Sequence, residues 1–184
     1  MNKNHEKKQI LIENLANHIL NKGMFDTSLR SMAKAVGTSD RMLLHYFKDK
    51  NDLITEVLNK ITENFMQVLS EIDFQKKPYI ELLQDFYQTI RNPLIHSYTK
   101  TWLELAALSA NGDQPYKTVS QKFMAEFLSW IKTKIIPDES IDTEDLSAFV
   151  LLITEGMIFL NSIDASHQID KSLSVLLKIK TQKK

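Results

Sequence analysis

A single glycine, Gly37, divides a segment that is otherwise rich in helix-forming residues, "SMAKAVGTSDRMLLHYFKDK" (31–50). Glycine adopts a positive φ without steric cost, so it lets the chain leave a helix abruptly. Ser39 follows two residues later and is a favoured N-cap for a new helix, as Thr27 or Ser28 is for the preceding one. The spacing therefore predicts two short helices, over about 28–36 and 39–46, that meet across a tight turn in a helix-turn-helix.

Apolar residues flank this turn at the positions where such a motif needs support. Ala33 is small enough to let the second helix approach closely, and Leu43 and Phe47 would hold that helix in place. A preceding one-faced helix over 7–22 supplies a surface for them to pack on. An unrelated helical hairpin is the alternative interpretation.

The remainder of the chain also favours helices. Four glycines and four prolines in 184 residues are too few for the many turns of an all-β protein. Helical periodicity continues over about 49–69, 78–92, 94–110, 116–136, 143–163 and 171–180. We therefore predict an all-α protein of about nine helices.

Several classes of function find no support in the sequence. Without cysteine there is no disulfide framework and no thiolate metal site, and the five histidines lack metal-ligand spacing. No glycine-rich phosphate loop and no catalytic arrangement is visible, so we expect no enzyme activity, cofactor or metal. The longest apolar run, "FVLLITEGMIFL", is interrupted by Glu155 and is too short to span a bilayer, and no signal peptide is recognisable. We expect a cytoplasmic protein without a membrane partner.

The net charge of zero conceals an asymmetry between the two parts of the chain. Residues 1–50 contain nine Lys and Arg against five Asp and Glu, whereas the remainder contains fourteen against eighteen. A basic first quarter on an acidic remainder suits a DNA-contacting head, although chance is the alternative explanation.

The segment "TSLRSMAKAVGTSDRMLLHYFKDKNDL" (27–53) resembles the DNA-binding region of TetR-type (tetracycline-repressor-like) transcriptional regulators. The resemblance covers about 10–58, and the rest agrees in helix count, length and the "TEGM" segment. The residues that carry it are Thr27, Leu29, Ala33, Gly37, Ser39, Leu43, Tyr46, Phe47, Lys50 and Leu53. It implies a helix-turn-helix domain over 1–50, a helical ligand-binding and dimerisation domain over 51–184, and a homodimer on a palindromic operator.

The helix after Ser39 would lie in the major groove of the operator. Arg41 suits bidentate contact with guanine, and Met42 and Leu44 suit the methyl groups of thymine. The hydroxyls and lysines around it suit phosphates. The full set of expected DNA contacts is Thr27, Ser28, Thr38, Ser39, Asp40, Arg41, Met42, Leu44, His45, Tyr46, Lys48 and Lys50.

Some of these roles have alternatives. Leu44 replaces a tyrosine common in the family, which removes one phosphate hydroxyl. Asp40 would accept from cytosine, pair with Arg41 or cap the helix. Tyr46 would face either the core or a phosphate, and His45 is equally consistent with an ordinary surface residue. The two lysines are also consistent with solvated charges.

Bulky side chains beyond residue 70, with Met66 before them, suggest an adaptable apolar pocket, although core packing explains most of them equally well. The expected ligand-binding residues are Met66, Phe86, Tyr98, Trp102, Glu104, Phe123, Phe127, Trp130 and Glu155. Glu104 and Glu155 would orient a ligand, face solvent or bond a neighbouring helix. Gly156 lies deep in a helix, which suggests close approach by another helix, although a flexible kink is the alternative. This helix resembles the glycine-bearing penultimate helix of the family, and the resemblance implies that the helices over about 143–163 and 171–180 pair with their two-fold mates in a homodimer, within about residues 143–180.

These features together predict a ligand-responsive transcriptional repressor. Its effector would be small and largely apolar or aromatic. The resemblance further implies that effector binding shifts the sixth helix, near Tyr98 to Glu104, against the fourth and so releases the operator. An activator, a regulator without an effector, and a helical binding protein for apolar small molecules without DNA-binding function are the alternatives.

Overall fold

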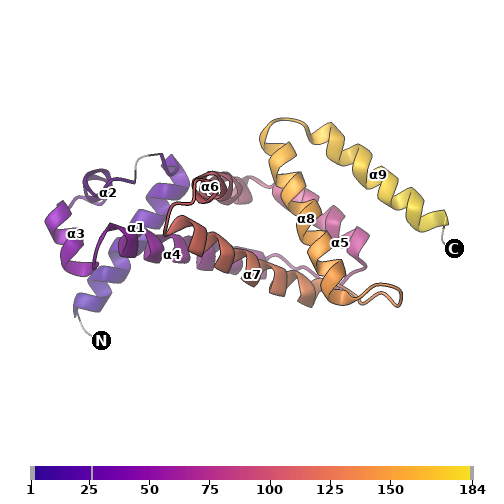
Figure 1. Ribbon diagram of the computed structural model, residues 1–184, viewed down its shortest axis with the longest axis horizontal. Helices are drawn as coiled ribbons and strands as arrows, with labels where there is room; N and C mark the ends of the chain where they lie inside the picture. The colour runs from indigo at the N-terminus through magenta and orange to yellow at the C-terminus, as the bar shows by residue number, and fades with distance from the viewer. Residues whose placement is uncertain (1–2, 26, 183–184) are drawn as a thin grey trace. The chain divides into compact units, whose positions relative to one another are not determined.

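The computed structural model describes residues 3–25 and 27–182, and over these ranges the chain forms nine α-helices and no strand (Figure 1). The all-α prediction is therefore confirmed. The helices are α1 (Lys3–Lys22), α2 (Leu29–Ala35), α3 (Asp40–Tyr46), α4 (Lys50–Glu71), α5 (Tyr79–Ile90), α6 (Pro93–Ala110), α7 (Tyr116–Lys134), α8 (Thr143–Ser162) and α9 (Ser166–Gln182).

Two helices begin earlier than their apolar periodicity indicates. α1 begins at Lys3 and not near residue 7, since its first turn, "KNHE", is polar and exposed and so gives no periodic signal. α9 begins at Ser166 and not near residue 171, only three residues after α8 ends, in a reversal where Asp164 has φ 58°. Ile169 is already buried near the start of α9.

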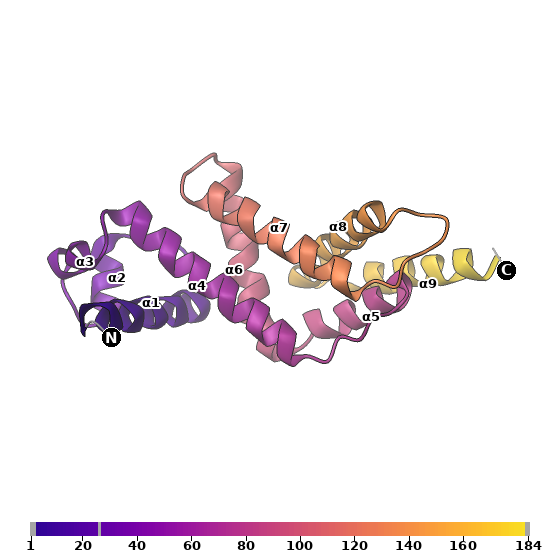
Figure 2. The same cartoon turned by 90° about the horizontal axis from the view of Figure 1, so that it is seen from below.

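The chain divides into two compact units, of which the first comprises the residues up to Glu71 together with Lys100–Phe123. Within it α1 packs along α4, and α2 contacts both α1 and α3 (Figures 1 and 2). Its core is made of fully buried apolar side chains from all four helices. They include Leu15, Ile19, Met32, Leu43, Leu53 and Leu58.

The second unit comprises Ile72–Thr99 and Met124–Lys184. In it α5 packs on α8 and α9, and α8 packs on α9. An aromatic cluster forms part of this core. In it the ring of Trp130 stacks on those of Phe127 and Phe86, with ring centroids 5.8 Å and 5.9 Å apart. α6 and α7 each contribute residues to both units. No helix in the described ranges is both long enough and apolar enough to cross a membrane.

Candidate nucleic-acid interface

The turn between α2 and α3 is a Schellman motif built on Gly37. The N–H of Gly37 donates to the carbonyl of Lys34 at 3.2 Å, and the N–H of Thr38 donates to that of Ala33 at 2.9 Å. This pattern requires a left-handed residue after the helix, and Gly37 has φ +67°. No other atom lies within 4 Å of the place a Cβ would occupy. The glycine is therefore needed for its backbone angle and not for space.

Serine caps begin both helices of the motif. The side chain of Ser28 accepts from the N–H of Ser31, and that of Ser39 accepts from the N–H of Met42, each at 3.2 Å. These oxygens satisfy N–H groups that the first turn of a helix leaves without partners. The Ser39 hydroxyl accepts in this bond and keeps its own proton, which is able to donate to a phosphate oxygen.

α3 turns one side inward and leaves the other side exposed. Leu43 is completely buried and Phe47, directly after the helix, is 2% exposed, so they attach α3 to the core. On the other side Arg41 and His45 are exposed, and Met42 and Leu44 remain 46% and 45% exposed. Apolar side chains that stay this open beside an exposed arginine form a surface able to contact base edges and methyl groups.

Asp40 lies in the first turn of α3, and Ser39 acts as the cap. No ion pair joins Asp40 to Arg41 in the described part of the chain, so the guanidinium group is not neutralised by its neighbour. The carboxylate complements the positive end of the helix dipole. Tyr46 is half-buried, with its ring edge-on to that of His45 at 5.1 Å.

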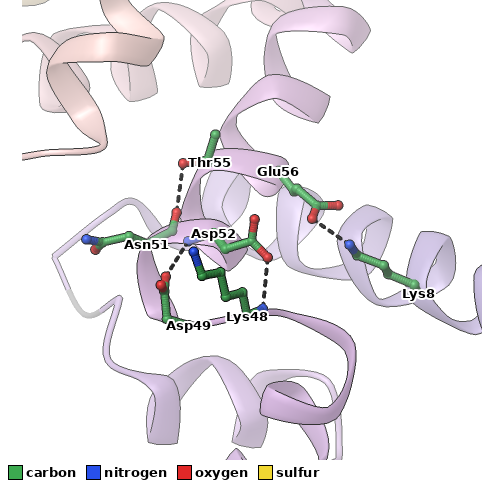
Figure 3. A network of polar contacts seen from close by, with 7 residues as sticks. All are labelled: Lys8, Lys48, Asp49, Asn51, Asp52, Thr55 and Glu56. Atoms are coloured by element: carbon green, nitrogen blue, oxygen red, sulfur yellow. Dashed lines mark hydrogen bonds and ion pairs between the residues drawn. The ribbon is translucent and has the colours of Figure 1, made fainter.

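A reciprocal pair of carboxylates fixes the start of α4 beside this surface (Figure 3). Asp49 accepts from the N–H of Asp52, and Asp52 accepts from the N–H of Lys48, both at 2.9 Å. This is a variant of the capping box, in which the carboxylate of Asp52 accepts from the N–H of Lys48 rather than from that of the cap residue Asp49. The side chains of Lys48 and Lys50 are exposed on either side of Asp49. One turn further along α4, Glu56 pairs with Lys8 of α1 at 2.5 Å.

Residues from α6 and α7 hold the loop that leads from α1 to α2. The carboxylate of Glu104 accepts from the N–H of Met24 at 2.6 Å, and the hydroxyls of Tyr116 and Thr27 lie 3.1 Å apart. Gly23, which ends α1 with φ +86°, lies against the same carboxylate, so that a Cβ there would be 2.8 Å from an oxygen of Glu104. Nothing in the sequence indicated these contacts, since the partners are 80 and 89 residues apart.

The expected ligand-binding residues fall into both units. In the first, Trp102 packs on Phe123 with centroids 5.0 Å apart, and Met66 and Glu104 are half-buried. The others, in the second unit, are Phe86, Tyr98, Phe127, Trp130 and Glu155. Phe86, Phe127 and Trp130 are in mutual contact in the aromatic cluster, while Tyr98 and Glu155 are half-buried. Across residues 3–25 and 27–182 no three acidic or histidine side chains gather to hold a metal ion.

This arrangement of helices recurs in solved structures over nearly the whole chain. A Rhodococcus sp. protein assigned to the TetR family of transcriptional regulators matches with a TM-score of 0.72 at 18% identity, covering 95% of this chain and 98% of its own. A transcriptional regulator from Rhodococcus sp. Rha1 matches with a TM-score of 0.69 at 17% identity, covering 93% and 96%. A protein from Streptomyces avermitilis, assigned as a TetR-type transcriptional regulator, gives 0.67 at 18%, covering 94% and 96%.

The chain has the TetR fold. No protein-family model matches the sequence, and no curated protein matches it either. The likeness is therefore visible in the helix arrangement and not in overall sequence, and it agrees with the resemblance carried by residues 27–53. In the TetR fold of this chain, α2 and α3 form the helix-turn-helix.

Proposed function

We propose that the protein is a DNA-binding transcriptional regulator that represses its target genes and has no enzymatic activity. The observation that carries this proposal is the exposed side of α3, which presents Arg41, Met42, Leu44 and His45 beyond a turn fixed by Gly37. A helix that packs on a compact support through its buried side, and whose other side is exposed, is able to enter the major groove of DNA.

In this proposal residues 1–50 read the operator. Arg41 specifies a guanine, while the methyl groups of thymine contact Met42 and Leu44. Ser39 and Lys50 contact phosphates and so fix the register of the helix on the duplex without reading sequence. The other hydroxyl and basic side chains expected from the sequence add to this set of phosphate contacts.

The protein would act as a homodimer through α8 and α9. The α8 stripe is defined here as Phe149, Leu152, Gly156 and Phe159 of α8 together with its C-cap residue, Ile163. The spacing of these residues alternates between three and four, as in a coiled-coil seam. The four apolar side chains are between 37% and 70% exposed. Gly156 is exposed, and no atom lies within 4 Å of the place a Cβ would occupy, so a partner helix has room to approach its backbone.

Residues 51–184 would receive a small effector and transmit its binding to the head. The contacts of Glu104 and Tyr116 with the loop after α1 support this route, because the loop leads directly into the Ser28 cap of α2. A displacement of α6 would alter this loop and with it the position of the helix-turn-helix. The effect on operator affinity is limited to the difference in the effector's affinity for the two states.

The test begins with the DNA itself. Genomic fragments retained by the purified protein are sequenced, and binding to the recovered site is compared between the wild type and Arg41→Ala. We expect Arg41→Ala to lose about 1–3 kcal/mol of discrimination at one base position. Lys76→Ala, which removes an exposed charge from the second unit, should bind as the wild type does.

Retention of no particular fragment would contradict the proposal and favour a ligand-binding protein without DNA-binding function. Equal binding of a recovered site by Arg41→Ala and the wild type would contradict the assignment of Arg41 as the residue that reads a guanine. Reporter expression from the recovered site, with and without the gene, distinguishes repression from activation.

A further inference from the structure

A cleft of about 410 Å³ lies in the second unit, where α5 ends, α6 begins and α8 ends. It is bordered by Ile90, Arg91, Pro93, His96 and Asn161. Three of these side chains carry polar nitrogen atoms, and none of the five is acidic. A volume of this size is sufficient for a small organic ligand.

The guanidinium group of Arg91 is held by an aromatic ring and not by a carboxylate. It lies over the ring of Tyr87, 5.5 Å from its centroid, in a cation–π contact. No carboxylate in the described ranges forms an ion pair with Arg91. The N–H groups on its planar fork are therefore available to an anion.

Two further side chains add donors to the same cleft. Asn161 accepts from the hydroxyl of Ser166 at 3.4 Å through its Oδ1, so its amide nitrogen is the end left to donate. His96 is exposed at the first turn of α6. With Arg91 they offer a guanidinium, an imidazole and an amide, which is a set of donors.

The backbone N–H groups at the start of α6 are not available to bind an anion in this cleft. Pro93 has no N–H, the N–H of Leu94 donates to the Asn92 side chain at 3.0 Å, and the N–H of Ile95 donates to the Asn92 carbonyl at 2.9 Å. An anion in this cleft would consequently be held by side chains.

The lining residues also indicate the type of anion. One permanent positive charge balances a single negative charge, whereas a phosphate group at neutral pH carries close to two. The fork of an arginine matches the two oxygens of a carboxylate. Ile90 and Pro93 provide an apolar wall for the rest of the molecule.

We propose that this cleft binds a small monocarboxylic acid with a short apolar or aromatic group. The carboxylate contacts Arg91, with His96 and Asn161 as additional donors, and the apolar group lies against Ile90 and Pro93. Such acids are then the effectors of the regulator, an assignment that rests on the proposed function.

The binding part is tested by calorimetry on the full-length protein without DNA. The probes are acetate, hexanoate and benzoate, each compared with its neutral amide, together with inorganic phosphate. We expect at least one carboxylate to bind at least tenfold more tightly than its amide and more tightly than phosphate.

Variants locate the binding site. Arg91→Gln should weaken carboxylate binding at least tenfold. Arg91→Lys should weaken it less, because lysine keeps the positive charge but lacks the planar guanidinium that contacts both carboxylate oxygens. His96→Gln should weaken binding less. Lys100→Gln, which removes an exposed charge from α6 outside the cleft, should leave binding unchanged. Because Arg91, His96 and Lys100 are exposed, unaltered thermal unfolding of these variants is expected and serves as the folding control.

Two results would overturn the binding site: no carboxylate binding more tightly than its amide, or full binding by the Arg91→Gln variant. The effector assignment is overturned if a carboxylate binds through Arg91 and yet leaves operator binding unchanged. None of these three results bears on whether the protein binds DNA, which the genomic-fragment and Arg41→Ala experiments decide separately.

Discussion

At the scale of single residues, Gly23 and Gly37 share a left-handed backbone conformation but differ in what surrounds them. Both have positive φ, but Gly37 has open space where a Cβ would lie, whereas Gly23 touches the carboxylate of Glu104. A side chain at Gly37 meets only the cost of the left-handed conformation. A side chain at Gly23 meets that cost and also displaces the acceptor of the Met24 N–H.

We therefore predict that Gly23→Ala destabilises the protein more than Gly37→Ala. Gly37→Ala should lower the free energy of unfolding by about 1–2 kcal/mol. Gly23→Ala should add up to about 1 kcal/mol, because the carboxylate of Glu104 has to move away from the part-buried N–H of Met24. Urea denaturation of the two variants measures the difference.

Glu104→Ala provides the control for this comparison. In a protein that already lacks the carboxylate, Gly23→Ala should cost about as much as Gly37→Ala, so the two substitutions should not be additive. Strict additivity would show that Gly23 and Glu104 do not interact.

A second residue-level prediction concerns Lys50, whose side chain is exposed at the start of α4. If it contacts a phosphate, Lys50→Ala should weaken binding about equally for all DNA sequences. It should also reduce the slope of log affinity against log salt concentration by about 1. Filter binding at several salt concentrations measures the slope, and an unchanged slope would assign Lys50 to solvent.

At the scale of elements, the start of α4 depends on its capping box. Asp49→Ala removes the acceptor of the Asp52 N–H and should lower the free energy of unfolding by about 1 kcal/mol. Asp49→Ser should retain most of that stability because serine is also a good N-cap. Equal stability of the alanine and serine variants, measured by thermal denaturation, would mean that water satisfies this helix end.

Element boundaries also show what the sequence was able to predict. Ser28, Ser39 and Gly37 mark helix ends through local chemistry, and the structure has α2 and α3 where these residues indicated. Local chemistry needs only neighbouring residues, so it is readable from the chain alone. The first turns of α1 and α9 were missed, because polar turns and a rapid reversal at Asp164 leave no periodic pattern.

Contacts between distant residues were not predictable in the same way. The sequence shows Glu104 as a carboxylate in apolar surroundings, but nothing near it in sequence indicates Met24 as its partner. Nothing in the sequence connects Arg91, His96 and Asn161 either, because their common cleft exists only once α5, α6 and α8 have packed. Such sites depend on tertiary packing, which periodicity does not encode.

At the scale of the whole molecule, the α8 stripe is a row of apolar side chains that the described part of the single chain leaves exposed. A two-fold interface presents the same residues from both subunits, so one substitution acts twice. Leu152 and Phe159 are 70% and 54% exposed in the chain, and burying the exposed part of each in a dimer would contribute about 1–2 kcal/mol per side chain.

Phe159→Glu should therefore convert the dimer to a monomer. It removes two apolar side chains from the interface and brings two like charges close to the axis. A loss of about 3 kcal/mol or more would raise the dimer dissociation constant at least a hundredfold. Analytical ultracentrifugation at micromolar concentration measures this change. Ile10→Glu, at a position 59% exposed on α1, is the matched control and should leave the oligomeric state unchanged.

The same variant links assembly to DNA binding. A dimer contacts two half-sites at once, so the second contact is effectively intramolecular and strengthens the first. A monomeric Phe159→Glu protein with an intact α3 should still contact one half-site but lose most of its affinity for the full operator. If Phe159→Glu remains dimeric, the dimer uses another surface. If the variant is monomeric and binds the full operator as the wild type does, a palindromic dimer is not the form that reads DNA.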